Sequence, residues 1–168
     1  MSKAVPTTVK DKIMKRLIFS AITICTALFP VPETAFAGSD DVVVESPWAR
    51  AAIGTTRPGA AYFIIHNTGD EAVTLMGDIA TPLAMTAQIH QTRISADGVS
   101  SMVPVGEILI APGHSIALEP GGMHAMLMML QGPMKEGETF PLTLTFEDGG
   151  KIAVEVPILG VAARGPDN

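Results

Sequence analysis

A chain of 168 residues, 47% of them apolar, is long enough to build one hydrophobic core and short enough to be a single domain. The sequence has 11 Lys and Arg against 17 Asp and Glu, which gives a formal net charge of -6 at pH 7. Such a surface repels nucleic acids and anionic lipids, and we expect neither as a partner.

The N-terminal part of the chain has the features of an export signal. Residues 14–16 (Met-Lys-Arg) are basic, residues 17–29 are apolar, and residues 35–37 (Ala-Phe-Ala) match the small-x-small pattern that signal peptidase cleaves. The apolar run is too short and too broken by prolines for a membrane span, so no stable membrane insertion is expected after cleavage. The prediction is therefore an N-terminal extension and signal peptide over residues 1–37, cleaved after Ala37, and an exported protein located in the periplasm.

Removal of this segment changes both the charge and the thiol content. Residues 1–37 hold five of the 11 basic residues and two of the 17 acidic ones, so the rest keeps six and 15, a net charge near -9. The chain's single cysteine, Cys25, lies in the same segment, and Ile24 before it is too bulky for lipoprotein processing. The exported protein is thus expected to have no disulfide, no Cys nucleophile and no thiolate ligand for a metal.

After residue 37, short runs of alternating or β-branched residues between turn signals predict consecutive strands and no helix. The expected strands are residues 42–48, 59–67, 72–76, 84–92, 101–105, 108–110, 115–118, 123–130, 142–147 and 151–156. Pro47 is typical of an edge or a bulge, and Asp97-Gly98 of a tight turn. Strands at this spacing predict an antiparallel sandwich or Greek-key barrel over residues 38–160, followed by a short disordered tail, residues 161–168.

Two histidines and two methionines are the candidate metal ligands. A Pro-Gly-Gly turn leads into the run 123–130, where His124 and Met126 share one face because side chains alternate along a strand. His90 and Met102 flank the Asp97-Gly98 turn, near the ends of two facing strands. Thioethers favour Cu(I), and acid competes with the metal only at the imidazoles. A blue-copper electron-transfer site is excluded because it requires a cysteine thiolate.

The spacing of these four residues resembles that of a known family. His90 precedes Met102 by twelve positions, Met102 precedes His124 by 22, and His124 precedes Met126 by two. All four match in register the motif of the PCu(A)C family of periplasmic copper chaperones, in which a further Met is optional and is replaced here by Gln91. Four flanking segments also resemble this family: Ser-Pro-Trp-Ala-Arg at 46–50, Gly-Ala-Ala-Tyr at 59–62, Pro-Gly-Gly at 120–122, and residues 142–150.

The resemblance implies a cupredoxin-like antiparallel β-sandwich of Greek-key type that binds one Cu(I) ion per chain through His90, Met102, His124 and Met126. It also implies a copper chaperone rather than an enzyme. Its role would be to carry copper for assembly of the binuclear copper centre of cytochrome c oxidase. The copper acceptor would be oxidase subunit II, a Sco-type protein, or both.

Two other functions are weighed against the copper carrier. A metal-free β-sandwich that serves as an interaction or adhesion module of the cell envelope would retain no Cu(I). An exported copper oxidase or reductase is disfavoured, because two His and two Met favour Cu(I) strongly enough to hinder redox cycling. No constellation of residues typical of a nucleophilic enzyme is seen.

The remaining histidines, methionines and aromatic residues have simpler interpretations. Core packing is predicted for Met76, Met85, Met129, Met134, Trp48 and Tyr62. Met123 and Met128 are left open between packing and the site, with packing preferred for Met123. His66 and His114 are expected at the surface or in turns. The acidic surplus is expected to be solvated, with Asp40, Asp41, Glu136 and Glu138 as candidates to contact a basic partner.

Overall fold

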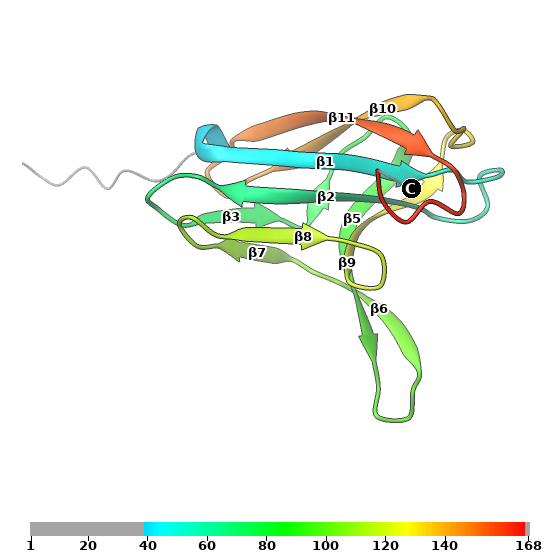
Figure 1. Ribbon diagram of the computed structural model, residues 1–168, viewed down its shortest axis with the longest axis horizontal. Helices are drawn as coiled ribbons and strands as arrows, with labels where there is room; N and C mark the ends of the chain where they lie inside the picture. Colours follow the sequence, from blue (N-terminus) through cyan, green and yellow to red (C-terminus); the bar gives the residue numbers. More distant parts are fainter. Residues whose placement is uncertain (1–38, 167–168) are drawn as a thin grey trace, which may run out of the picture. The chain divides into compact units, whose positions relative to one another are not determined.

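The computed structural model of the protein describes residues 39–166, and these residues form strands joined by turns (Figure 1). The expected signal peptide and its cleavage site lie outside the described residues. The elements are a 3-10 turn η1 (Ser39–Asp41) and the strands β1 (Val42–Arg50), β2 (Gly59–Asn67), β3 (Val73–Met76), β4 (Asp78–Ile79), β5 (Ala84–Ile94), β6 (Ser100–Pro104), β7 (Glu107–Ile110), β8 (Ser115–Leu118), β9 (Met123–Leu130), β10 (Thr139–Thr145) and β11 (Lys151–Leu159). Within 39–166, no helix has the length and apolarity that a membrane crossing requires.

The strand prediction is confirmed in most places. Strands β2, β8 and β9 have the predicted bounds, β5 and β11 run further than predicted, and β4 was missed because two residues carry no periodicity. The bulge expected at Pro47 is present, since the register of β1 against β2 shifts between Glu45 and Trp48. Ser46 there has a positive φ of 48°, which bends the strand as a bulge does.

Nine strands form one sheet that wraps round until its two ends meet. The order is β10-β11-β1-β2-β9-β5-β4, with β8 beside β2 and β6 beside β5, and β3 and β7 form a separate pair. Ala80, just after β4, exchanges two backbone hydrogen bonds of 3.0 and 2.8 Å with Thr143 of β10. The predicted all-β sandwich is therefore confirmed, and it is nearly closed into a barrel. Strand pairs are antiparallel except β1 and β11, which run parallel where Ala49 faces Ile158.

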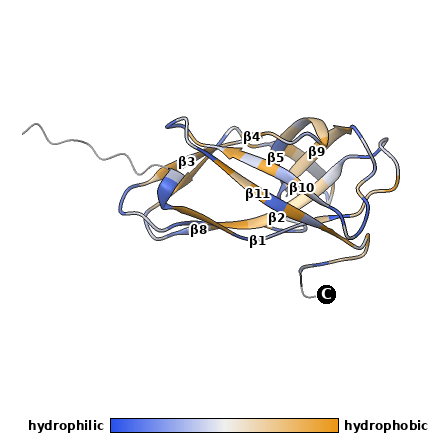
Figure 2. Ribbon diagram, turned by 90° about the horizontal axis from the view of Figure 1, so that it is seen from above, coloured by the Kyte–Doolittle hydropathy of each residue, from blue (hydrophilic) through white to orange (hydrophobic). Residues whose placement is uncertain are grey.

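The core is built from the inward faces of the strands. Phe63 and Ile65 of β2, Leu127 of β9, and Leu142 and Leu144 of β10 are almost fully buried. In Figure 2 hydrophobic colour is frequent along the strands, and hydrophilic colour appears in several connections and at intervals within the strands. Each fully buried aliphatic or aromatic side chain contributes about 1.5–3 kcal/mol, so these residues hold the sheet closed.

A second, smaller apolar cluster lies on the other side of the sheet from the main core. Trp48 and Tyr62 are both buried, as predicted, with ring centroids 4.5 Å apart, and they face each other across β1 and β2. Ala163 packs against them and is 8% exposed, although we expected residues 161–168 to bury little. Arg50 Nε donates a 2.7 Å hydrogen bond to the carbonyl of Ala163, which ties this segment to β1.

The predictions for the packing methionines are correct in part. Met134 is buried, and Met76 is half-buried. The core prediction is wrong for Met85 and Met129, which are 71% and 57% exposed. Met129 has a positive φ of 53°, and this interrupts the alternation at the end of β9. The neighbouring residues Ala84 and Leu130, which pair with each other, are buried in their place.

Candidate metal centre

His90 and His124 face each other directly across the strand pair β5–β9. Their ring centroids are 6.3 Å apart, and the two ring planes are inclined by 40°. Metal–nitrogen bonds of about 2 Å put each ring centroid about 3 Å from an ion, so two imidazoles that share one ion have centroids up to about 6 Å apart. The observed separation of the two rings is thus close to that of two imidazoles sharing one ion.

Register places both methionines of the predicted site on the same face as the two histidines. Met126 of β9 lies opposite Gln88 of β5, and Met102 of β6 lies opposite Thr92 of β5. Positions 88, 90 and 92 of one strand share a face, and directly paired residues of neighbouring strands share it too. His90 is thus flanked by Met126 toward one end of β5 and by Met102 toward the other.

The imidazole of His90 is buried without any hydrogen-bond partner. The residue is 9% exposed, and neither Nδ1 nor Nε2 has a partner within the described part of the chain. Burial lowers the pKa of His90 below its ordinary value of 6.5, and the positive charge of a protonated His124 lowers it further. The neutral ring that results has a free lone pair, which is the form that binds a metal.

His124 is held in a defined tautomer by the turn that precedes it. Its Nδ1 lies 3.2 Å from the carbonyl oxygen of Gly122 in the Pro-Gly-Gly turn. A carbonyl oxygen only accepts, so Nδ1 carries a proton, and in the neutral ring Nε2 keeps its lone pair. Metal-binding histidines are commonly oriented by a bond of this kind from their other nitrogen.

Met102 is the accessible member of the set. It is 55% exposed, while His90 and His124 are buried. It lies on the hairpin made by the far end of β5 and by β6, which projects away from the rest of the sheet (Figure 1). Ile94 and Val99 near the tip of this hairpin are exposed as well. A flexible thioether here can reach toward His90 or turn to solvent.

Met128 and Gln91, whose roles the sequence left open, lie on opposite faces of the strand pair β5–β9. Met128 lies opposite Thr86, two positions beyond Met126, so it shares the face of the site. Gln91 pairs with Met123 and belongs to the opposite face. Gln91 in place of a second methionine therefore removes no donor from the face that carries His90. Strand parity could have shown this from the sequence.

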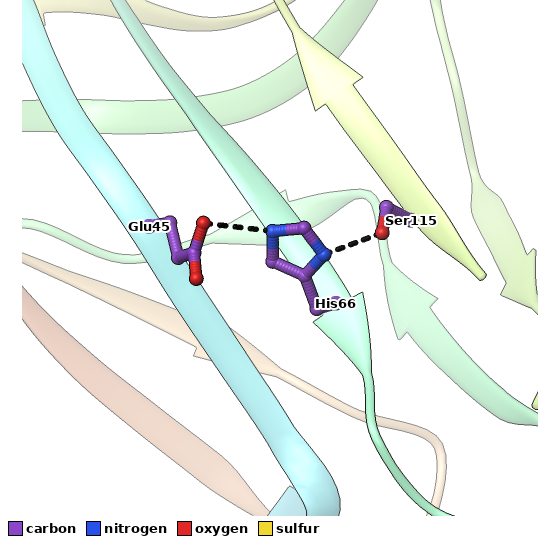
Figure 3. A network of polar contacts seen from close by, with 3 residues as sticks. All are labelled: Glu45, His66 and Ser115. Atoms are coloured by element: carbon purple, nitrogen blue, oxygen red, sulfur yellow. Dashed lines mark hydrogen bonds and ion pairs between the residues drawn. The ribbon is translucent and has the colours of Figure 1, made fainter. Parts of the chain in front are cut away.

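A separate polar network, which includes none of these residues, joins side chains of three strands (Figure 3). His66 of β2 bonds Ser115 of β8 through Nδ1 and Glu45 of β1 through Nε2, the latter at 3.0 Å. The combination of Ser, His and carboxylate is that of a hydrolase triad. However, neither of two surface cavities of about 390 and 510 Å³ is lined by any of the three. We interpret the network as a tie between strands, consistent with the surface position predicted for His66.

No cluster of three or more His, Cys, Asp or Glu side chains that could hold a metal occurs within residues 39–166. His114, the remaining histidine of this part, is exposed and bonds the carbonyl of Pro112 within its own turn, as predicted. The structure brings together His90, His124, Met126 and Met102 on one face, with Met102 at its accessible margin.

Comparison with known proteins places the chain in a family. Residues 42–158 match the family described as "LpqE-like: Putative lipoprotein LpqE-like". The chain belongs to the LpqE-like family. A relative named "Putative lipoprotein Lxx21020" from Leifsonia xyli subsp. xyli (strain CTCB07) is 32% identical over 144 residues, 84% of each chain.

Solved structures share the fold. The apo PCuAC domain of PmoF2 superposes with a TM-score of 0.59 at 22% identity, over 74% of this chain and 94% of that domain. The copper-bound PCuAC domain of PmoF2 gives 0.57 at 20% identity, over 71% and 93%. Apo-DR1885 from Deinococcus radiodurans gives 0.56 at 27% identity, over 95% and 97%. The LpqE-like chain therefore has the cupredoxin-like sandwich of PCuAC domains, as the sequence predicted.

Proposed function

We propose that this LpqE-like protein is an exported Cu(I) carrier that binds one ion per chain through His90, His124, Met126 and Met102. The observation that carries the proposal is the pair of buried imidazoles on one face with two thioethers, in which both nitrogens of His90 lack a partner among residues 39–166. A buried polar group without a protein partner needs an explanation, and a role as a metal ligand supplies one. The fold shared with a copper-bound PCuAC domain supports the choice of metal.

The donor set suits a cargo ion better than a catalytic one. Two neutral imidazoles and two neutral thioethers match a soft monovalent ion that accepts low coordination numbers. The thioethers carry no proton, so a modest change of pH acts on binding only through the histidines. The exposed Met102 gives an acceptor access to one side of the ion. We therefore propose a metallochaperone without catalytic turnover.

The acceptor that we propose is a copper protein of the respiratory chain. Family resemblance points to the binuclear copper centre of cytochrome c oxidase, with subunit II or a Sco-type protein as the receiving partner. The test is an anaerobic transfer experiment, in which the Cu(I)-loaded protein is mixed with the copper-free soluble domain of subunit II, alone and with a reduced Sco-type protein. Transfer to either acceptor supports a carrier. Copper that stays on the protein with both acceptors contradicts the assignment to oxidase assembly.

Export is part of the proposal. The N-terminus of the mature protein decides whether the exported protein is free or attached to a lipid. Signal peptidase cleavage would leave a free protein that begins at Gly38, in the periplasm. The family description and the relative's name both contain the word lipoprotein, which reopens Cys25 as a site of lipid attachment despite Ile24. Mass spectrometry of the protein from the envelope fraction separates the two. An N-terminus at Gly38 supports a free periplasmic protein. A lipid-modified N-terminal Cys25 would show instead that the protein is a membrane-anchored lipoprotein.

A further inference from the structure

A surface cavity of about 510 Å³ lies between the end of β1, the start of β2 and the segment after β11. Two arginines line it, Arg50 from the end of β1 and Arg57 from the loop before β2. Small apolar residues, among them Ala52, Pro58 and Ala60, form much of the remaining lining. Cavities of this size hold small organic molecules in other proteins.

The charge in this cavity is opposite to that of the protein as a whole. Only six basic residues follow residue 37, against 15 acidic ones, and two of the six line this one cavity. Among residues 39–166, no acidic residue lines it. Within residues 39–166, ion pairs join His66 to Glu45 and Lys135 to Glu138, and neither arginine of the cavity takes part in one. The two guanidinium groups are thus available to an anion from outside.

Arg50 is held in place before any ligand arrives. Its guanidinium carbon lies 5.8 Å from the centroid of Trp48 and 5.7 Å from that of Tyr62, and its Nε donates to the carbonyl of Ala163. The bond to Ala163 uses one of the five N–H donors of the group. A guanidinium held by such contacts loses little entropy when its remaining donors bind a planar carboxylate.

We propose that this cavity is a binding site for the carboxylate of a small organic acid with a compact apolar body. The two arginines would bind the carboxylate, and the alanines and proline would contact the apolar part. Ile53 and Val161, which also line the cavity, are 93% and 66% exposed and extend the apolar surface at its margin. A large acidic macromolecule is disfavoured, because the surplus of acidic residues elsewhere on the protein would repel it.

The site is distinct from the candidate metal centre and adjoins it. Ala60 lines the cavity and pairs directly with Met126 across β2 and β9, so both side chains lie on the same face. A ligand in the cavity therefore changes the surroundings of Met126 more than those of the exposed Met129. The proposal stands without copper binding, because it depends on none of the four candidate ligands.

The test is an NMR titration of the metal-free protein, recovered after export of the full chain, with benzoate and with uncharged benzamide as probes. Benzoate is expected to shift the Nε–H signal of Arg50 and the methyl signal of Met126, with smaller effects from benzamide. Arg57→Gln is expected to weaken benzoate binding by about tenfold or more, the usual effect of losing a charged hydrogen bond. The matched control is Arg93→Gln, which removes the same charge from an exposed position outside the cavity.

The outcomes separate specific binding from a general charge effect. Equal weakening by Arg57→Gln and Arg93→Gln, or equal shifts by benzoate and benzamide, would overturn the proposal, as would the absence of any shift. A parallel arm uses a short peptide that ends in Phe, with a free or an amidated C-terminus. Binding of the free-carboxylate peptide alone, without benzoate, would overturn the small-acid assignment in favour of a protein terminus. Retention of Cu(I) by Arg57→Gln, measured separately, shows that the metal proposal is independent of this result.

Discussion

His90 is a poor residue for stability and a good one for binding a soft metal. Both of its ring nitrogens are buried, and neither has a partner in the part of the chain that the structure describes. Its strand neighbour Ile89 is fully buried in the apolar core. An unsatisfied buried polar group costs about 1–3 kcal/mol, and a metal ion would recover that cost in the loaded protein. The metal-free protein should therefore be less stable than its hydrophobic core would allow.

Replacement of His90 by a side chain of similar volume tests this directly. In metal-free protein we expect His90→Leu to leave the free energy of unfolding unchanged or to raise it by about 1–3 kcal/mol, because no unpartnered nitrogen remains. The matched control Ile89→Ala should lower it by about 2–5 kcal/mol through the cavity it creates. Urea unfolding measures both. A loss from His90→Leu as large as that from Ile89→Ala would contradict the assignment.

The depressed pKa of His90 gives the metal-free protein a defined pH dependence. The unfolded chain takes up a proton at this side chain near 6.5, while the folded chain does so only at lower pH, mainly because of burial. Below about 6.5 the unfolded state therefore binds more protons, and the free energy of unfolding falls as the pH falls. Urea unfolding at pH 7.5 and 5.0 should show a larger acid loss for the wild type than for His90→Leu. Equal losses would refute the contribution of His90.

Strand parity distinguishes two methionines that lie three residues apart. Met126 shares the face of His90, whereas Met129 is exposed and has left the alternation. Met126→Ala should weaken Cu(I) binding by about tenfold or more, as expected for the loss of a metal ligand, and Met129→Ala should leave it unchanged. Competition with a coloured Cu(I) chelator gives both affinities. Comparable losses in the two variants would rule out the strand-face argument.

At the scale of elements, the position of β6 depends on a close backbone crossing near Gly77. Gly77 accepts a hydrogen bond from Ile89 and donates one to Gly106, and Val105 bonds Ile89 as well. A Cβ at position 77 would lie 1.7 Å from the carbonyl oxygen of Val105. This crossing sets where the chain leaves β6, and so where Met102 lies relative to His90.

Alanine at Gly77 should therefore disturb both stability and the metal site. We expect Gly77→Ala to lower the free energy of unfolding by about 1–3 kcal/mol, since the clash requires a backbone shift. Gly106→Ala is the control, because a Cβ there meets nothing within 4 Å, and it should be neutral or stabilising by less than about 1 kcal/mol. Cu(I) affinity should fall in the first variant only. Equal stability of the two variants would contradict the role given to the close backbone approach at Gly77.

Local rules predicted most elements, and long-range contacts explain the differences. Alternation and turn residues are local, so strands such as β2 and β9 could be placed from the sequence. The parallel pairing of Ala49 with Ile158 joins distant parts of the chain and leaves no local pattern. The exposure of Met85 depends on which element covers the end of β5, and periodicity does not contain that information.

At the scale of the whole molecule, the four candidate ligands come together because their spacing fits one sheet. The positions 90, 102, 124 and 126 could be selected from the sequence, and parity placed His124 and Met126 on one face. The central position of His90 and the lack of partners for its nitrogens among residues 39–166 could not be predicted from the sequence. Both depend on the pairing of β5 with β6 and with β9. The arginine cavity was missed as well, since Arg50 and Arg57 line one cavity together with Val161 only in the folded chain.

The most direct test of the copper assignment is an anaerobic titration of the exported protein with Cu(I), against a coloured Cu(I) chelator. A variant in which His90, Met102, His124 and Met126 are all replaced is titrated beside it. We predict one ion per chain for the wild type, held in competition with the chelator, and none for the variant. If neither protein competes, the carrier assignment is wrong and the protein is a metal-free interaction module. If both compete equally, the ion is bound elsewhere.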